Sequence, residues 1–230
     1  LFNERAIVYR KENHFDHTDV ALSVGIQQLV DAKSAGVIFT IDTESGFKDV
    51  VVVTSSWGLG ENVVQGHISP DEFTVFKPTM AIIKKHLGTK EKKLVSFKKD
   101  VLKNIKTTAK ERDTYSINDE QVIQLSKWAK TIEEHYKRPM DIEWGLDKKT
   151  DQLFILQARP ETVRSRDDVN VIEQYELLEK SEVLVTGTSV GSKIGSGKVC
   201  KIEHVKDIEK FIPGSVLVTE MTDPDWVPIM

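Results

Sequence analysis

The clearest periodic pattern in the chain is an apolar stripe between residues 118 and 139. Apolar residues recur there at spacings of three and four, which is the period of an amphipathic helix. Asn118 is suited to cap the N-terminus of such a helix, and Pro139 follows its last apolar position. The stripe consists of Val122, Leu125, Ala129, Ile132 and Tyr136. We therefore predict one long helix that turns a single face to a core.

Shorter runs of β-branched and alternating apolar residues predict strands on both sides of this helix. The last two of these runs flank a turn at residues 145–151 and should form a hairpin. Residues 1–11 mix apolar and charged positions in the manner of a helix end. The predicted strands cover residues 22–30, 36–41, 50–54, 140–144 and 152–159. Together these elements predict a mixed fold of the α+β or α/β class.

The pattern of residues along the sequence changes near residue 165. Residues 164–170 are polar and charged, as expected of a linker, and short strands with glycines follow them. These strands are predicted at residues 183–186, 198–202 and 215–219, a short helix at residues 204–211, and a second helix opening at Asp223-Pro224. We therefore predict two domains, residues 1–165 and residues 166–230.

Composition limits the class of protein. The 230 residues are 39% hydrophobic, carry a formal charge of −4 and include one cysteine, Cys200. A single cysteine excludes an intramolecular disulfide framework and any metal site built from several cysteines. No apolar run approaches the roughly 20 residues that cross a bilayer, and the first residues do not resemble a signal peptide. We expect a soluble, cytoplasmic piece of a longer protein, with no membrane contact.

Charge is unevenly distributed along the chain. Residues 77–110 hold eleven lysines but only two acidic residues, Glu91 and Asp100. A basic block can bind nucleic acid, yet this one has no arginine and a single aromatic residue, Phe97, so it offers neither bidentate base contacts nor base stacking. We interpret it as a solvated lysine face on a hairpin and predict no nucleic-acid partner. A basic nucleic-acid-binding patch stays as the weaker alternative.

The residues with the most chemical meaning lie on the predicted hairpin. Asp141 and Glu143 are two positions apart on one strand and therefore face the same side, about 7 Å apart. Gln157 and Arg159 share a face of the other strand in the same way. Two carboxylates, an amide oxygen and a guanidinium suit a Mg²⁺-bound polyphosphate, because Mg²⁺ takes oxygen ligands and arginine clamps phosphate. The alternative from spacing alone is a solvated salt-bridge face.

Other candidate sites give weaker signals. The run Gly58-Leu59-Gly60 matches neither the dinucleotide fingerprint nor the P-loop, so a tight turn is favoured over a phosphate cradle. His14 and His17 have no third metal ligand nearby, and we interpret them as surface residues. Cys200 lies in a strand pattern, which indicates a small core residue rather than a nucleophile.

Several runs in the chain resemble motifs of the phosphoenolpyruvate synthase (pyruvate, water dikinase) family. They follow the family's order and cover nearly the whole chain. In one-letter code they are AGVIFTIDTESG at residues 35–46, WGLGENVVQG at 57–66, PDEF at 70–73, PMDIEW at 139–144, QARPETV at 157–163 and LVTEMTDPDW at 217–226.

This resemblance implies a fold and a reaction that spacing alone does not show. Residues 1–165 would be the C-terminal part of an ATP-grasp nucleotide-binding domain. Residues 166–230 would be a linker and the start of a swivelling β/β/α phosphohistidine domain. The family converts ATP, pyruvate and water to phosphoenolpyruvate, AMP and phosphate through a phosphohistidine. Pyruvate would bind a TIM-barrel domain that these residues do not include, and the full-length enzyme would be a candidate homodimer.

The resemblance also implies Mg²⁺ as cofactor, ATP as substrate and a role for each residue of the hairpin face. Glu143 and Gln157 would be the Mg²⁺ ligands. Arg159 would be the catalytic residue that contacts phosphate, with Asp141 as its companion in the nucleotide site.

The adenine side of the nucleotide site is implied by a run that resembles the family's hinge strand, where Gln27 and Leu29 would bind the nucleotide. The phosphohistidine would lie beyond Met230, so none of the histidines here is assigned to it. Because the family's upstream lysine, its histidine loop and its barrel are missing, we expect no dikinase turnover from these residues alone. Pyruvate, phosphate dikinase, rifampicin phosphotransferase and a non-catalytic nucleotide-binding module stay as alternatives.

Overall fold

The computed structural model describes residues 4–12, 14–19, 21, 23–97, 101–161, 182–185, 187, 194–222 and 224–229. The chain divides into two compact units, one of residues 29–192 and one of residues 1–28 with 193–230. The predicted linker at residues 164–170 and the domain boundary after residue 165 lie outside the described residues, and both stay predictions.

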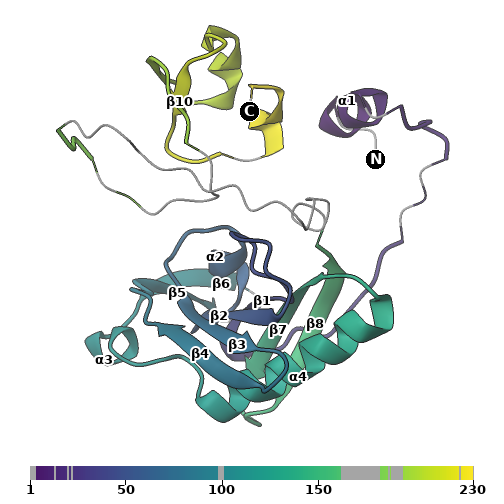
Figure 1. The fold of residues 1–230 in the computed structure, drawn as a ribbon, viewed down its shortest axis with the longest axis vertical. Coiled ribbons are helices and arrows are strands. Elements are labelled where there is room, and N and C mark those ends of the chain that lie inside the picture. The colour runs from purple at the N-terminus through teal and green to yellow at the C-terminus, as the bar shows by residue number, and fades with distance from the viewer. Residues whose placement is uncertain are drawn as a thin grey trace. The chain divides into compact units, whose positions relative to one another are not determined.

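A six-stranded sheet forms the centre of the unit of residues 29–192 (Figure 1). The strand order is β4-β3-β2-β1-β7-β8, and every neighbouring pair is antiparallel. The strands are β1 (Ala32–Phe39), β2 (Val50–Trp57), β3 (Asp71–Phe76), β4 (Ala81–His86), β7 (Met140–Asp147) and β8 (Leu153–Pro160). Four of the predicted strands are thereby confirmed, and the unit is of the α+β class rather than the α/β class.

The predicted long helix is confirmed as α4 (Asp119–Tyr136), which covers one face of the sheet. The Asn118 side chain accepts a hydrogen bond from the backbone N–H of Gln121, and the Gln121 side chain accepts one from the N–H of Asn118. This capping box satisfies two backbone donors that the first turn would otherwise leave unpaired. The buried core between helix and sheet consists of Ile38, Val51, Val53, Phe73, Val75, Ile117, Val122, Leu125, Ala129, Met140, Ile142, Trp144 and Leu146. Each large side chain buried there contributes about 1.5–3 kcal/mol.

Gly36 shows how tightly the central strands pack. Trp144 on β7 is paired with Gly36 on β1, and its indole Nε1 donates to the carbonyl of Thr54 on β2 at 3.3 Å. A Cβ atom on Gly36 would lie 1.9 Å from the Thr54 oxygen, so a side chain there would collide with backbone. Glycine at this position therefore permits both the strand spacing and the packing of Trp144.

A separate two-stranded hairpin, β5 (Lys92–Phe97) and β6 (Val101–Lys106), joins the sheet near the short helices α2 (Glu61–Val64) and α3 (Ala109–Arg112). The junction depends on Gly58, whose φ is +81°. A Cβ atom on Gly58 would lie 2.3 Å from the Leu94 carbonyl oxygen, which also accepts a hydrogen bond from Leu59 N. Packing of the hairpin therefore explains the glycine at position 58. Gly58 and Leu59 form bridges with Leu94, and Gly60 is the N-cap of α2, so the choice between a tight turn and a phosphate cradle stays a prediction.

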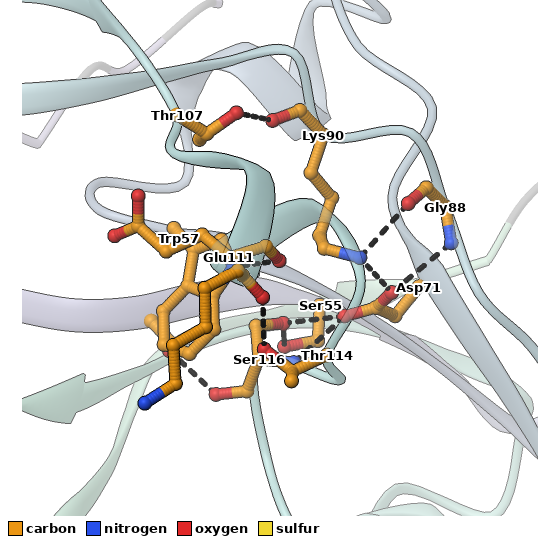
Figure 2. Close-up of polar contacts among 11 residues, drawn as sticks. Ser55, Trp57, Asp71, Gly88, Lys90, Thr107, Glu111, Thr114 and Ser116 are labelled. Carbon is orange, nitrogen blue, oxygen red and sulfur yellow. Dashed lines mark hydrogen bonds and ion pairs between the residues drawn. The ribbon is translucent and has the colours of Figure 1, made fainter.

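Lys90 is completely buried, so the prediction of a solvated lysine face is wrong at this position. Its ammonium contacts Asp71 Oδ1 and donates to the Gly88 carbonyl at 2.8 Å (Figure 2). The other oxygen of Asp71 accepts from the backbone N–H and the hydroxyl of Ser116, both at 2.8 Å, and Ser116 Oγ lies 2.6 Å from Ser55 Oγ. A buried charge is tolerated when it is paired and hydrogen-bonded in this way.

Lys77 is the second buried exception in the lysine block. Its ammonium donates to the carbonyls of Thr40 and Lys48 at 2.6 and 2.5 Å and pairs with Glu133 of α4 at 2.7 Å. These contacts tie the loop after β1 to α4. The described lysines at positions 84, 85, 103, 106 and 110 are exposed, as predicted.

The other unit contains few regular elements. They are α1 (Glu4–Glu12), β9 (Val199–Lys201), β10 (Val216–Val218) and two short 3₁₀ helices, η2 (Val205–Lys210) and η3 (Pro224–Ile229). The strands β9 and β10 pair in parallel, and Ile202 and Trp226 are buried. The predicted helices and the strands at residues 198–202 and 215–219 are confirmed in position. Cys200 is half-buried on β9 rather than in a closed core.

Two predicted strands do not form. Residues 23–30 have no regular structure, although their alternation predicted a strand over 22–30. Val24 is 82% exposed and Ile26 is fully exposed, because no described strand pairs with this segment. Residues 183–185 are likewise exposed and not in a strand, and Thr186 lies outside the described residues.

Candidate nucleotide and metal site

The hairpin of β7 and β8 brings together the four residues that the sequence singled out. Asp141 is directly opposite Arg159, and Glu143 is directly opposite Gln157. We call these pairs the charged rung (Asp141–Arg159) and the polar rung (Glu143–Gln157). Because they are two positions apart on each strand, both rungs lie on one face of the sheet. This is the face opposite to α4, since Ile142 and Trp144 between and beside them point into the core.

The charged rung is an ion pair in which the two partners differ in exposure. Both contacts of Arg159 are with the same oxygen, Oδ2 of Asp141. Nε donates to it at 2.8 Å, and Nη2 lies 2.7 Å from it. The Asp141 side chain is 12% exposed, whereas that of Arg159 is 63% exposed. The carboxylate thus anchors one edge of the guanidinium, while much of the guanidinium stays accessible to a ligand.

The polar rung has the opposite character. Glu143 is half-buried between β1 and β8, and no hydrogen bond or ion pair joins its carboxylate to a described residue. Gln157 is exposed and likewise makes no side-chain hydrogen bond within the described part of the chain. The rung therefore presents carboxylate and amide oxygens that are free to take a ligand.

Glu143 and Gln157 are the two residues of the β7–β8 pair, hereafter the β7–β8 ladder, that offer unpaired oxygen ligands to a metal ion. The described residues contain no group of three or more His, Cys, Asp or Glu side chains placed to hold a metal ion. A cation bound here would need further ligands from its substrate or from water, as Mg²⁺ at phosphate sites does.

A β-bulge in β8 explains how one strand serves both the core and the site. Leu153 and Ile155 pack against the core, whereas Gln157 and Arg159 belong to the opposite face, yet all four have odd numbers. A regular strand would place all of them on one side. The register shift between Glu143 and Trp144 leaves Leu156 as the extra residue and changes the side of the residues that follow.

The two residues predicted for the adenine side fall in different units. Leu29 begins the unit of residues 29–192 and is 66% exposed. Its neighbour Val30 reaches the ladder, with Cγ1 at 3.7 Å from the position that a Cβ would take on Gly145. Gln27 is exposed and belongs to the other unit. The roles of Gln27 and Leu29 both stay predictions.

Sequence reasoning missed the buried cluster around Asp71 and Lys90. One signal was present, because Asp71 has the same parity as Phe73 and Val75 on β3 and so occupies a core position. A carboxylate at such a position needs a buried partner. Nothing local pointed to Lys90, which lies beyond the next strand, and the resemblance attached no role to either residue.

Comparison with known proteins assigns the chain to a family. The family model described as "Pyruvate phosphate dikinase, AMP/ATP-binding domain" matches residues 1–179. Over its whole length the chain is 51% identical to a phosphoenolpyruvate synthase of Synechocystis sp., 50% identical to that of Helicobacter pylori and 48% identical to that of Escherichia coli. The chain covers 30%, 31% and 30% of these relatives, respectively.

The chain therefore belongs to the pyruvate phosphate dikinase AMP/ATP-binding domain family, a class of nucleotide-binding domains. Within that class it is similar to phosphoenolpyruvate synthases, which confirms the resemblance predicted from its motifs. It spans about 30% of the length of the curated relatives that it matches. Among the described residues, no helix combines the length and the apolar character needed to cross a bilayer.

Proposed function

We propose that the β7–β8 ladder binds Mg²⁺ and the phosphates of ATP, and that the chain does so as part of a phosphoenolpyruvate synthase. The observation that carries this proposal is the register, which puts the charged and polar rungs side by side on the face of the sheet opposite to α4. The family match supports a nucleotide ligand. The uncommitted Glu143 carboxylate supports a cation as part of that ligand.

The polar rung fits Mg²⁺ by the chemistry of its donors. Mg²⁺ prefers oxygen ligands and is held at phosphate sites by one or two carboxylates together with substrate oxygens and water. Glu143 would supply the carboxylate and Gln157 the amide oxygen. When bound, Mg²⁺ would neutralise negative charge on the phosphates and help to orient them.

The charged rung would act on the phosphates directly. Asp141 holds the Arg159 guanidinium by one edge, which restricts the rotation of a long side chain before the ligand arrives. The remaining guanidinium N–H groups would donate to phosphate oxygens and stabilise negative charge that develops on the transferred group. Arg159 is therefore our candidate catalytic residue, and Asp141 positions it.

The finer fold and the full reaction rest on the resemblance and on the identity to the synthases. We propose that residues 1–165 belong to an ATP-grasp domain and that residues 166–230 open a swivelling phosphohistidine domain. ATP would pass its β-phosphate to a histidine outside these residues and its γ-phosphate to water. Pyruvate would then accept the phosphoryl group at another domain, giving phosphoenolpyruvate, AMP and phosphate, and the full-length enzyme would work as a homodimer in the cytoplasm.

The test is ³¹P NMR on the full-length protein that carries this segment, with Mg²⁺ and ATP, in the presence and absence of pyruvate. Pyruvate-dependent phosphoenolpyruvate with AMP and phosphate is the expected result. A requirement for added phosphate, with pyrophosphate as product, would instead assign a pyruvate, phosphate dikinase. Nucleotide binding without turnover would assign a non-catalytic module. The 230 residues alone are expected to form no AMP.

A further inference from the structure

The β5–β6 hairpin carries a pair of lysines that the proposed function does not use. Lys92 on β5 is directly opposite Lys106 on β6. The N–H of Thr107 donates to the Glu91 carbonyl, so the two lysines form a pair of the kind without backbone hydrogen bonds between its members. The Cα atoms of such a pair are only about 4.5 Å apart. Two positive side chains therefore leave the hairpin from almost the same point.

Within the described residues, no negative charge offsets this pair. Neither Lys92 nor Lys106 makes an ion pair or a side-chain hydrogen bond there, whereas Lys93, on the other face of the hairpin, is paired with Glu111. Like charges directly opposite each other destabilise a sheet. The pair therefore lowers the stability of the free protein, and a bound anion would remove the repulsion.

A buried asparagine orients a third polar group on the same face. Asn104 is two positions from Lys106 on β6 and therefore shares its face. Asn62 of α2 is only 3% exposed and donates from Nδ2 to Asn104 Oδ1 at 2.7 Å. With its oxygen held in this way, Asn104 has its N–H₂ group left as a donor. Two ammonium groups and an amide donor on one face are suited to an anion.

The buried Asp71–Lys90 pair fixes the base of the hairpin beside the two lysines. Thr107, which follows Lys106, donates from Oγ1 to the Lys90 carbonyl at 2.6 Å (Figure 2). The Lys90 ammonium contacts Asp71, and all three residues are buried. The donors of the hairpin are therefore held in place before a ligand arrives, which lowers the entropic cost of binding.

The size of the cationic face indicates the size of the ligand. In the described part of the hairpin, the next two pairs on this face are Leu94–Asn104 and Ser96–Leu102, and neither carries a charge. A nucleic-acid backbone repeats its charges along the strand and is bound by several cations. One close pair of lysines instead fits a single anionic group.

We propose that Lys92, Lys106 and Asn104 bind a phosphate group of a small molecule. This site goes beyond the proposed function and does not depend on it, since none of the three residues belongs to the β7–β8 ladder. Lysine binds phosphate as a point charge, and the two ammonium groups and the amide can donate to different oxygens of one phosphate. The ligand would also stabilise the folded hairpin, because it binds the folded state.

The test is calorimetric titration of inorganic pyrophosphate into the full-length protein that carries this segment, without Mg²⁺ and at low ionic strength. Lys106→Met and Lys92→Met should each weaken binding about tenfold, as the loss of one charge-assisted hydrogen bond would. Lys110→Met is the matched control, because it removes an exposed lysine that belongs to α3, and it should change the affinity less than about twofold. Arg159→Met, in the β7–β8 ladder, should likewise leave the affinity of this site unchanged.

Thermal unfolding gives an independent readout. Without pyrophosphate, Lys106→Met should unfold at a higher temperature than the wild type, because the repulsion is gone. Pyrophosphate should raise the midpoint of the wild type and of Lys110→Met more than that of Lys106→Met.

Three results would overturn the proposal. A wild type that does not bind pyrophosphate would do so, and so would equal weakening in Lys106→Met and Lys110→Met, which would show diffuse attraction to the lysine block. Loss of all binding in Arg159→Met would assign the anion to the ladder instead. The proposed function has its own test in turnover, so it does not fail with this one.

Discussion

Asp71 and Glu143 are acidic residues on strands of the same sheet, and their surroundings could hardly differ more. Asp71 is fully buried on the α4 side, and its two oxygens accept from Lys90, Gly88 and Ser116. Glu143 is half-buried on the side opposite to α4, and no described residue donates to it. A carboxylate with every acceptor position filled stabilises the fold, whereas one held in place without a partner is available to a ligand.

The charged rung lies between these two extremes. Asp141 is nearly buried and committed to Arg159, whereas Arg159 is mostly exposed. Asp141 thus has a structural role, whereas its partner Arg159 is accessible to a ligand. A structural ion pair and a binding site can contain the same types of residue, and what distinguishes them is how many hydrogen-bonding positions of those residues are unfilled.

The largest expected effect is on folding. Lys90→Met would leave Asp71 buried without its cation, which should lower the free energy of unfolding by about 3–5 kcal/mol. Urea denaturation followed by tryptophan fluorescence measures this. Lys84→Met is the matched control, because Lys84 is exposed and lies 3.9 Å from Glu72, so it should change stability by less than about 0.5 kcal/mol. Equal effects of the two variants would contradict a structural role for the buried pair.

The next effect is on activity and not on folding. Glu143→Ala in the full-length protein should reduce AMP-forming turnover about 10²–10³-fold, as expected for the loss of one electrostatic contact at reacting groups. Its thermal midpoint should match that of the wild type, because the carboxylate has no partner to lose. Unchanged turnover at saturating Mg²⁺ would count decisively against the assignment of the polar rung.

Arg159→Lys tests the accessible side of the charged rung. Lysine keeps the charge but loses the planar fork, so it cannot contact Asp141 and phosphate along two edges at once. We expect kcat/KM for Mg-ATP to fall about tenfold, which corresponds to one charge-assisted hydrogen bond of about 1.5 kcal/mol. Arg138→Lys, at an exposed arginine between α4 and β7, is the control. A fall of the same size in that control would remove the specific role of Arg159.

The smallest effect concerns the ion pair that joins the β5–β6 hairpin to α3. Burial acts to raise the pKa of the Glu111 carboxyl, but hydrogen bonds from Lys93 and Thr108 outweigh it and hold that pKa below its usual 4.5. Glu111→Gln keeps the capping box and loses the ion pair, so at pH 7 the free energy of unfolding should fall by about 0.5 kcal/mol.

The pH dependence of this difference follows from the direction of the shift. A carboxyl with a lowered folded pKa contributes stability above its unfolded pKa and loses it as pH falls through the folded pKa. The gap between wild type and Glu111→Gln should therefore close as the pH is lowered below 4.5. Urea denaturation curves at pH 7 and at acidic pH measure it. A gap that stays constant would show that the charge of Glu111 contributes nothing.

Local features of the chain were predicted well because their causes are local. The cap at Asn118 and the apolar stripe depend on residues within a few turns of each other, and α4 follows them. The four residues of the rungs could be singled out in the same way, because alternation along each strand places Asp141 with Glu143, and Gln157 with Arg159. Their exact pairing could not be predicted, because counting from the turn would place Glu143 opposite Leu156, and only the bulge brings Gln157 there. The strand over residues 22–30 failed because alternation indicates a strand only where another strand is present to pair with it.

By itself, the sequence determined the helix, the hairpin, the four residues of the two rungs and the resemblance to the synthases. The tertiary structure alone decided which charges are buried. Lys77 and Lys90 look like their solvated neighbours in the sequence, and only contacts from distant elements remove them from water. It also decided the bulge at Leu156, because the register of β8 depends on a core that must accept Leu153 and Ile155 while Gln157 faces the other way. Periodicity in the sequence indicates which side chains share a face of a helix or strand. Which face is buried, and how two strands are aligned, is decided only when the elements pack together.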